Sequence, residues 1–192
     1  RNEARVTARH VRRPSRVYLE VPSRAREAEF LERVRKSRRL HRPWLKAPET
    51  SEQFREFLQR TRGVRHISLF VCSNESVELA GVVNLNEIVR GLFHSAYLGY
   101  YAFEPFAGQG LMREGLALVL DRAFGELGLH RLEANVQPGN RRSRQLVEGL
   151  GFRLEGFSPC YLKIGGRWRD HERWAILREE WSKVRASRRA KR

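Results

Sequence analysis

The sequence predicts a single mixed α/β domain, and three observations lead to that prediction. Its 192 residues match the size of one compact domain, and no internal repeat or linker divides them. A long apolar helical run separates strand patterns at residues 96–103 and 131–136, and this order favours a right-handed crossover between parallel neighbours. Gly165-Gly166, between two alternating stretches, predicts a tight antiparallel hairpin. The predicted sheet is therefore mixed.

The first part of the chain predicts two helices. Apolar residues at helical spacing indicate a helix over residues 25–39, and Pro43 ends it. Thr50 and Gln53 form a capping-box pattern at the start of the second helix. The apolar residues of that second helix share one face: Phe54, Phe57 and Leu58.

Three strands and a long helix are expected next. Apolar residues alternate over 67–71, and residues 79–85 and 96–103 predict two further strands, with turns between them. A helix then begins after Gly108-Gln109-Gly110, and Gly128 lies where a C-terminal cap would be. Its apolar face contains Leu116, Val119, Leu120, Ala123, Phe124 and Leu127.

The last part of the chain predicts one short helix among strands. Residues 131–136 alternate as a strand does, and Asn140 can cap a helix that Gly151 ends. Strand patterns follow at 152–157, 161–164 and 168–177.

Composition excludes several classes of protein. With 41% hydrophobic residues, the body of the chain is not a disordered segment. Its longest apolar stretch, residues 116–120, is far shorter than the ~20 residues of a membrane span. No secretory signal is recognisable, and Cys72 and Cys160 have neither disulfide-framework nor metal-ligand spacing. We therefore expect a cytoplasmic protein without a metal, and Cys72, on an apolar strand, in the core.

The chain is strongly basic, with a formal net charge of +16. Much of the excess lies near the two ends, at about residues 1–16 and 183–192. One interpretation is that these are solvated or frayed tails. The other is that they guide the protein electrostatically toward an RNA-rich partner.

The turn before the long helix is a candidate phosphate site. A Walker loop needs Lys-Ser or Lys-Thr after its second glycine, and this chain has neither pair there. A dinucleotide fingerprint needs a third glycine at position 113, but the third glycine of this chain is Gly115, two positions later. What remains is a strand, a G-x-G turn and a helix. The amides of Gly108, Gln109, Gly110, Leu111 and Met112 can converge there on a diphosphate beside the helix dipole. A tight turn that binds nothing is the alternative.

Three segments, taken together, resemble the GNAT acetyltransferase superfamily, in particular its RimJ/RimL-like ribosomal-protein-alanine N-acetyltransferase branch. The first is Ile88-Val89-Arg90-Gly91 with Tyr97-Leu98-Gly99-Tyr100, and the second is Gly108-Gln109-Gly110-Leu111-Met112. The third runs from Asn135 through Asn140, Arg142-Ser143 and Leu150-Gly151-Phe152 to Trp168-Arg169-Asp170-His171. The resemblance covers roughly residues 40–181.

The resemblance implies a fold and a cosubstrate. The expected fold is a mixed, mostly antiparallel seven-stranded sheet with helices on both faces, splayed between the parallel strands at 96–103 and 131–136. Acetyl-CoA would lie in that opening. The cofactor-binding positions implied are Phe103, Gly108, Gln109, Gly110, Leu111, Met112, Asn135, Asn140 and Arg142. The family often has Gln or Arg where this chain has Pro105, and we expect binding by backbone amides to tolerate that change.

Roles in catalysis and acceptor binding are also implied. Ser143 resembles a residue placed to protonate the departing thiolate, although a first-turn hydroxyl bonded to backbone is the alternative. Trp44 lies in the loop where the family builds its acceptor-peptide wall. Close relatives tend to have an acidic residue where this chain has Cys160, so the base stays open. Candidates for the base, acting directly or through water, are Glu87, His94 and Glu104.

The function expected is transfer of an acetyl group from acetyl-CoA to the α-amino group of a protein N-terminus, such as alanine of a ribosomal protein. An α-amino group, with a pKa of ~8, is deprotonated more easily near neutrality than a lysine at ~10.4. One alternative keeps the fold and changes the acceptor to a small amine, an antibiotic or an aminoacyl-tRNA. Another is a non-catalytic module that binds RNA or the ribosome. The protein is expected to be a monomer or a homodimer.

Overall fold

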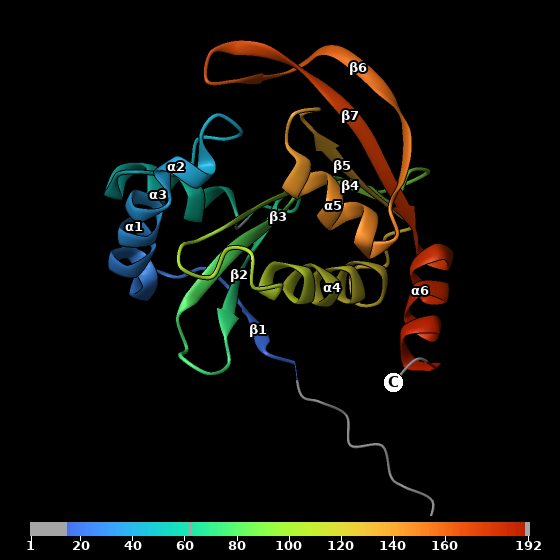
Figure 1. Ribbon diagram of the computed structural model, residues 1–192, viewed down its shortest axis with the longest axis horizontal. Coiled ribbons are helices and arrows are strands. Elements are labelled where there is room, and N and C mark those ends of the chain that lie inside the picture. Colours follow the sequence, from blue (N-terminus) through green and yellow to red (C-terminus); the bar gives the residue numbers. More distant parts are fainter. Residues whose placement is uncertain (1–14, 62, 191–192) are drawn as a thin grey trace, which may run out of the picture.

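The computed structural model describes residues 15–61 and 63–190, and it is built around one sheet (Figure 1). The order of the strands in the sheet is β1-β2-β3-β4-β5-β7-β6. The strands are β1 (Val17–Glu20), β2 (Ile67–Ser73), β3 (Leu79–Val89), β4 (Ser95–Ala102), β5 (Arg131–Val136), β6 (Arg153–Ile164) and β7 (Arg167–Leu177). The helices are the 3-10 turn η1 (Arg24–Arg26), α1 (Glu27–Lys36), α2 (Arg38–His41), α3 (Ser51–Arg60), α4 (Leu111–Phe124), α5 (Arg141–Leu150) and α6 (Arg178–Ala190).

The sheet is mixed, as the sequence predicts. Every neighbouring pair is antiparallel except β4 and β5, which α4 connects as a crossover helix. The predicted hairpin at Gly165-Gly166 joins β6 to β7, whose register runs from Ile164↔Arg167 to Arg153↔Ala175. The expected seven-stranded, mostly antiparallel architecture is therefore confirmed.

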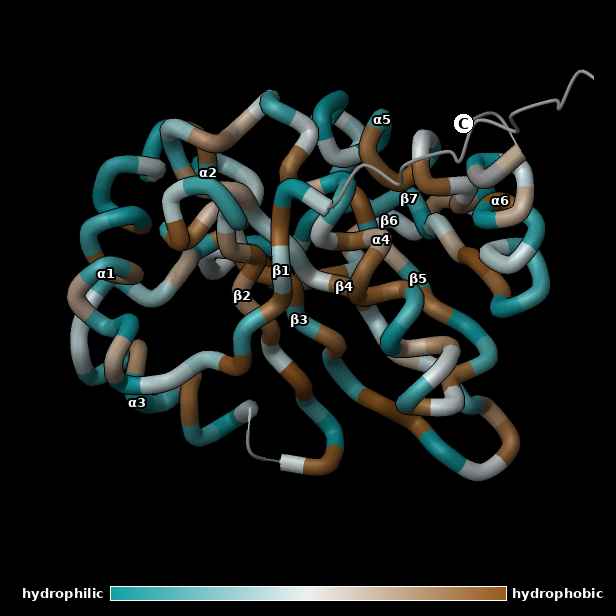
Figure 2. The backbone as a smooth tube through the Cα atoms, turned by 90° about the horizontal axis from the view of Figure 1, so that it is seen from below, coloured by the Kyte–Doolittle hydropathy of each residue, from teal (hydrophilic) through white to brown (hydrophobic). Residues whose placement is uncertain are grey.

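Helices pack on both faces of the sheet, and each face has its own apolar core. The larger core packs α4, α5 and α6 on one face, and its buried members include Leu116, Leu120, Leu132, Leu150 and Trp181. The smaller core packs α1 and α3 on the other face through a cluster of aromatic rings. This second core contains Phe30, Phe54, Phe57, Phe70 and Phe103. Figure 2 shows the hydrophobic parts of the central strands enclosed by helices with hydrophilic outer turns.

The second core leaves part of its face uncovered. Its buried strand residues come from β2 and β3, and in the described chain none comes from β5, β6 or β7. The sheet face over β4, β5 and β7 therefore stays open on the side of α1 and α3. We call this region the open face; it comprises the residues of β3, β4, β5 and β7 whose side chains alternate with those of the larger core.

β4 and β5 diverge, as the resemblance implies. They pair at only four positions, from Ser95↔Arg131 to Leu98↔Ala134. Beyond that point β4 stays paired with β3 as far as Ala102, and β5 stays paired with β7 as far as Val136. The two central strands therefore part along their second halves, and the sheet opens there.

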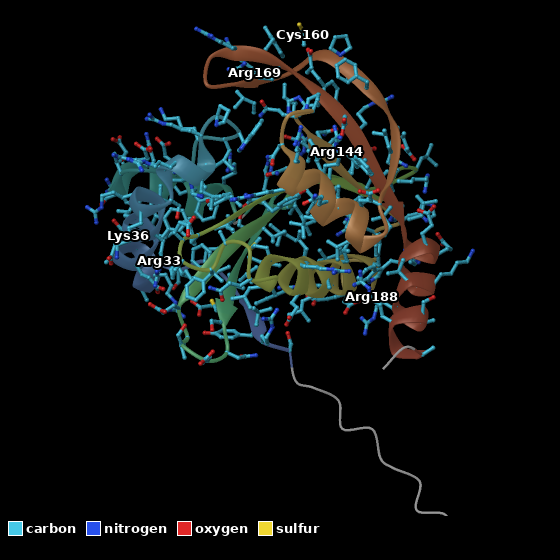
Figure 3. The ribbon with its side chains drawn as sticks, viewed as in Figure 1. Arg33, Lys36, Arg144, Cys160, Arg169 and Arg188 are labelled. Carbon is cyan, nitrogen blue, oxygen red and sulfur yellow. The ribbon has the colours of Figure 1, made fainter. Side chains whose placement is uncertain are left out.

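Several segments differ from the sequence expectations, and the single helix predicted over residues 25–39 is divided into η1, α1 and α2. β1 has only four residues, too few for a periodic pattern to be detected. The two strands predicted at residues 152–157 and 161–164 form one long strand, β6, which begins at Arg153 and bulges between Ser158 and Leu162. Cys160 lies in that bulge and points away from the body of the protein (Figure 3). Residues 178–190 form α6.

The ends of the chain were predicted to be basic tails. Residues 1–14 lie outside the described residues, so the expectation for that segment is unchanged. Residues 183–190 belong to α6, which packs on α4: the Trp181 indole donates a 2.8 Å hydrogen bond to Asp121. Across the described chain, no helix combines the length and the apolar composition needed to cross a lipid bilayer.

Candidate active site

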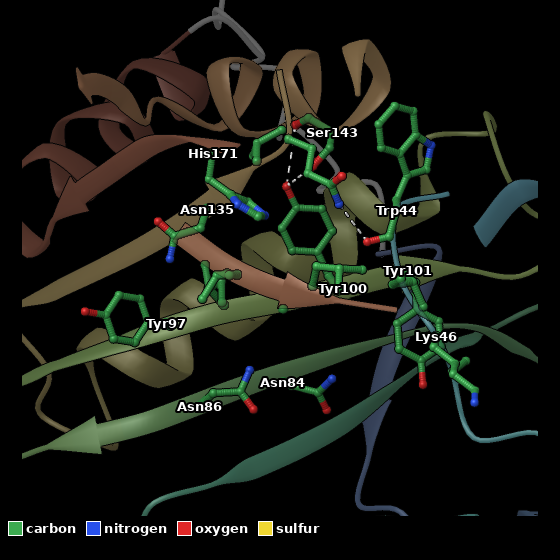
Figure 4. Close-up of a pocket in the computed structure, with 18 of the residues that line it drawn as sticks. Trp44, Lys46, Asn84, Asn86, Tyr97, Tyr100, Tyr101, Asn135, Ser143 and His171 are labelled. Carbon is green, nitrogen blue, oxygen red and sulfur yellow. Dashed lines mark hydrogen bonds between the residues drawn. The ribbon is translucent and has the colours of Figure 1, made fainter. Parts of the chain in front are cut away.

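A pocket of about 830 Å³ lies where the sheet opens, and it joins the open face to the start of α5 (Figure 4). Its walls come from the α2–α3 loop, β3, β4, β5 and the β6–β7 hairpin. Of the predicted site residues, five line it: Trp44, Glu87, Asn135, Asn140 and Ser143.

The floor of the pocket is polar because the strands alternate. Val83, Leu85 and Leu98 belong to the larger core, so their neighbours Asn84, Asn86, Tyr97 and Gly99 face the open side. Asn135 on β5 faces the same side, and its buried Oδ1 has no hydrogen-bond partner among the described residues. An unpaired buried acceptor of this kind is costly, so Asn135 is suited to a ligand that donates a hydrogen bond.

The side chains of Tyr100, on β4, and Ser143, in the first turn of α5, meet where the sheet opens. Their hydroxyl oxygens lie 2.6 Å apart, and Figure 4 marks this hydrogen bond. Asn140 holds the start of α5, since its side chain accepts from the Ser143 N–H at 3.1 Å. Burial raises the pKa of Tyr100 to about 12, so its hydroxyl keeps its proton throughout the physiological range. The sequence analysis singled out Ser143 but missed Tyr100, whose partner is 43 residues away.

The G-x-G turn before α4 is arranged as an anion site. Gly110 caps the helix with φ 81°, a left-handed conformation in which glycine carries no steric penalty. The turn's carbonyls are already engaged: Gly110 O accepts from Arg113 and Glu114 N–H groups, and Gln109 O accepts from Arg16. The Gln109 N–H bonds the Phe106 carbonyl at 3.4 Å.

The remaining N–H groups of this turn are available to a ligand. Within the described chain, the N–H groups of Gly108, Gly110, Leu111 and Met112 have no hydrogen-bond partner. The side chains of Leu111 and Met112 are buried in the larger core, so these two residues can serve a ligand only through their backbone. The helix dipole adds positive potential at this point. The turn therefore suits a diphosphate.

Two further positions named for the cofactor differ in their surroundings. Phe103 is fully buried against Phe30, and its N–H donates to Ala80 O. Its side chain belongs to the smaller core and does not line the pocket. Arg142 is exposed in the first turn of α5, next to Ser143.

The three candidate bases do not come together in the pocket. Glu87 lines the pocket, but its carboxylate is paired with Arg65 at 2.5 Å and lies 3.7 Å from His66. His94 precedes β4 and Glu104 follows it, so they lie near opposite ends of that strand, and neither is among the residues that line the pocket. Cys160 is exposed outside the pocket, whereas Cys72 is buried in the smaller core, as expected.

A histidine that sequence analysis missed as a site residue lines the pocket from β7. His171 is only 2% exposed, and its Nδ1 lies 2.9 Å from the Arg169 carbonyl. A carbonyl only accepts, so Nδ1 carries the hydrogen and the neutral ring has a free lone pair on Nε2. Burial lowers the pKa of His171. The side chain is thus a neutral imidazole with an accepting nitrogen, at the edge of the same pocket as Ser143.

Trp44 is held against the opposite wall. Gln137 donates a 2.9 Å hydrogen bond to the Trp44 carbonyl, and a methyl group on Gly139 would come within 3.2 Å of the indole. The close approach of Gly139 therefore holds the indole against the wall of the pocket. Among the described residues, no group of three His, Cys, Asp or Glu side chains could hold a metal ion.

Comparison with known families decides the assignment. The model of the acetyltransferase (GNAT) domain matches residues 16–153, which span the sheet opening, the G-x-G turn and the start of α5. The chain belongs to the GNAT acetyltransferase family. GNAT acetyltransferases use acetyl-CoA as their acyl donor.

Individual relatives of this GNAT family member include enzymes with different acceptors. The probable N-acetyltransferase YjcK of Bacillus subtilis is 42% identical over 112 residues, and the ribosomal protein uS5 alanine N-acetyltransferase of Escherichia coli is 41% identical over 105 residues. These alignments cover 58% and 55% of the chain, but only 61% and 54% of the relatives' own lengths. The spermidine N(1)-acetyltransferase of Vibrio cholerae is 26% identical over 153 residues, covering 79% of the chain and 88% of the relative.

A solved structure also matches this GNAT chain. Mycobacterium smegmatis RimJ in complex with CoA-disulfide superposes with a TM-score of 0.79 and 27% identity, covering 85% of this chain and 83% of the other. The free N–H groups at the start of α4 and the parted strands β4 and β5 fit a CoA ligand, since they offer donors for its phosphates and an opening for its arm.

Proposed function

We propose that this GNAT acetyltransferase transfers an acetyl group from acetyl-CoA to the α-amino group of a protein N-terminus, such as the alanine of a ribosomal protein. The observation that carries the proposal is the charge of the pocket. Lys46, Arg60 and Lys163 line it, whereas Glu87 is the one carboxylate among its described lining residues and is already paired with Arg65. A polyamine with several ammonium groups would meet repulsion here, whereas a peptide end brings a single amine.

The 41% identity to the uS5 alanine N-acetyltransferase supports the same acceptor class. The strongly cationic chain also suits a partner that carries RNA, because basic surfaces raise the rate of encounter with polyanions.

Acetyl-CoA, when bound, supplies a thioester whose acetyl carbon the acceptor nitrogen attacks. The chain's contribution begins with binding. The N–H groups of Gly108, Gly110, Leu111 and Met112 would hold the diphosphate, and Asn135 would accept a hydrogen bond from the pantetheine arm with its unpaired Oδ1. Because the fold fixes both the G-x-G turn and Asn135, orientation of the bound acetyl-CoA supplies much of the rate acceleration.

Proton transfer falls to residues on both sides of the opening. Ser143 Oγ would donate a proton toward the departing sulfur, the Tyr100 hydroxyl, 2.6 Å away, would pass its own proton to Ser143, and water would return one to Tyr100. On the open face, the Nε2 lone pair of His171 would take the proton that the amine loses. We prefer His171 to Glu87 as this base because the Glu87 carboxylate is engaged by Arg65.

A direct assay tests the proposal. The protein is incubated with acetyl-CoA and either an alanine-starting peptide, the same peptide blocked at its N-terminus, or spermidine, and free thiol is measured. We expect thiol release with the free peptide and little with the other two acceptors. Release with spermidine alone would overturn the peptide assignment in favour of a small amine.

A further inference from the structure

A small hollow on the open face lies beside the pocket's opening and has no role in the mechanism above. Gly99 forms its floor on β4, between the aromatic side chains of Tyr97 and Tyr101. In the register of the sheet, Gly99 lies directly opposite Asn84 of β3, with Asn86 two residues further along. All five residues line the pocket.

Two amide groups point their donors into this hollow. A methyl group placed on Gly99 would lie 3.2 Å from Asn86 Nδ2 and 3.9 Å from Asn84 Nδ2. Both NH₂ groups therefore converge over the glycine. In Figure 4 the amide nitrogens of Asn84 and Asn86 lie on the same side as Tyr100, with their oxygens turned away.

A buried serine fixes the direction of one of these amides. The Ser68 hydroxyl, in a residue only 5% exposed, donates a 2.6 Å hydrogen bond to Asn84 Oδ1. Because Ser68, on the neighbouring strand β2, occupies that oxygen, the NH₂ group of Asn84 is turned to the other side, toward Gly99 of β4. The hollow is consequently lined by donors.

Converging N–H donors complement an oxygen that accepts two hydrogen bonds. A peptide carbonyl is such an oxygen, and it lies two bonds from the α-carbon that carries the reacting amine. An ammonium or amine chain has no such acceptor and would leave the amides unpaired, which costs binding energy. The missing side chain at Gly99 provides the space in which the oxygen fits.

We propose that Asn84 and Asn86, over Gly99, bind the carbonyl oxygen of the acceptor's first residue, and that Ser68 orients Asn84 for this purpose. The inference rests on the proposed function, since it concerns how the same site recognises a peptide. The hollow selects acceptors that carry a carbonyl beside the α-amine, and so separates peptide ends from polyamines.

The test compares two acceptors in two enzymes. One acceptor is an alanine-starting peptide, and the other is the same peptide with its first peptide group replaced by an E-alkene, which keeps the shape and removes the carbonyl. The wild type should use the natural peptide with a kcat/KM roughly tenfold higher than the analogue, the size expected for one hydrogen-bonded carbonyl. In Asn84→Ala this preference should shrink to about twofold or less.

Further variants distinguish recognition from misfolding. Gly99→Ala should raise the KM for the peptide and leave acetyl-CoA binding, measured by calorimetry, unchanged. Asn74→Ala, in the β2–β3 turn and outside the pocket, is the matched control and should retain the wild-type preference. An equal preference in wild type and Asn84→Ala would overturn the inference. Failure of the wild type to acetylate any peptide would instead overturn the proposed function.

Discussion

The Tyr100 hydroxyl lies 2.6 Å from the Ser143 hydroxyl and connects the parted strand β4 to the first turn of α5. Because this contact spans the opening, we expect the two side chains to act as one proton-donating unit. The Tyr100 pKa of about 12 means that the unit stays protonated when the pH is raised to about 10.

The Tyr100–Ser143 pair should behave non-additively. Tyr100→Phe and Ser143→Ala are each expected to lower kcat by about 10²-fold, since either change breaks the same proton path. The double variant should be no more than a few-fold worse than the single variants. Steady-state kinetics with acetyl-CoA and a peptide measures all three. Losses that multiply would show that the two hydroxyls act separately.

Gly110 and Gly128 allow a matched test of the phosphate turn. Both have positive φ, 81° and 62°, so an alanine at either position should cost about 1 kcal/mol of stability. At Gly110 the new methyl would also lie 3.2 Å from Arg16 and disturb the free N–H groups, whereas at Gly128 it meets nothing within 4 Å. Calorimetry should show an acetyl-CoA Kd roughly tenfold higher for Gly110→Ala alone. Equal affinities for both variants would contradict this assignment.

The N-cap of α5 should matter for both stability and activity. Asn140→Ala removes the bond to the Ser143 N–H and should cost about 1 kcal/mol in urea unfolding. Thr50→Ala is the control, because Thr50 caps α3 in the same way, through the Gln53 N–H at 3.2 Å. A similar stability loss is expected for both. Only Asn140→Ala should also lower kcat, by roughly tenfold, through displacement of Ser143; an unchanged kcat would mean that the cap does not position it.

Acid should destabilise the fold through two buried histidines. Burial lowers the pKa of both His41 and His171 below 6.5, so the unfolded chain binds protons more readily than the folded one. Their contribution to stability is complete above about pH 7 and is lost as the pH falls through 6.5 toward the lowered values. Chemical denaturation between pH 7.5 and 5 should show the decline, and it should be shallower in His41→Gln. A His41→Gln curve parallel to that of the wild type would exclude this residue as a cause.

Protonation of His171 at acidic pH should also lower kcat, because the protonated ring can no longer accept a proton. His171→Gln is expected to lower kcat by about 10²-fold and to remove the acidic limb of the kcat profile, while acetyl-CoA binding stays unchanged. The matched change His41→Gln, in a histidine that bonds the Ala102 carbonyl and lies outside the pocket, should leave that limb in place. Persistence of the limb in His171→Gln would assign the base to another group.

Local patterns in the sequence predict much of the fold. The glycine turn, the cap at Asn140 and the left-handed Gly151 each depend on residues within one turn, so they can be recognised without tertiary information. β1 and α6 were not predicted. β1 is stabilised by pairing with β2, fifty residues later in the chain, and α6 by Trp181 and Arg185 bound to Asp121 of α4. The basic residues in and around β1 and α6 resemble tails in the sequence because the segments that stabilise these two elements are far away along the chain.

Some residues of the candidate site can likewise be predicted from local sequence patterns, and others cannot. Ser143, Asn135 and the G-x-G turn lie in segments with recognisable local patterns. Tyr100, His171 and the Ser68–Asn84 pair become visible only when β2, β3, β4 and β7 are placed side by side. Phe103 shows the opposite effect: the resemblance implied a cofactor contact there, whereas its aromatic ring completes a buried cluster.

The four residue pairs between β4 and β5 have a consequence for natural variants of this protein. This short ladder joins the two halves of the sheet, so an exchange at Ala96 or Leu132, a buried pair within it, would alter the separation of the halves without touching an acceptor or a phosphate. When inherited differences between strains change how fast such an enzyme works, the positions to inspect therefore include this seam as well as the residues that meet the reactants.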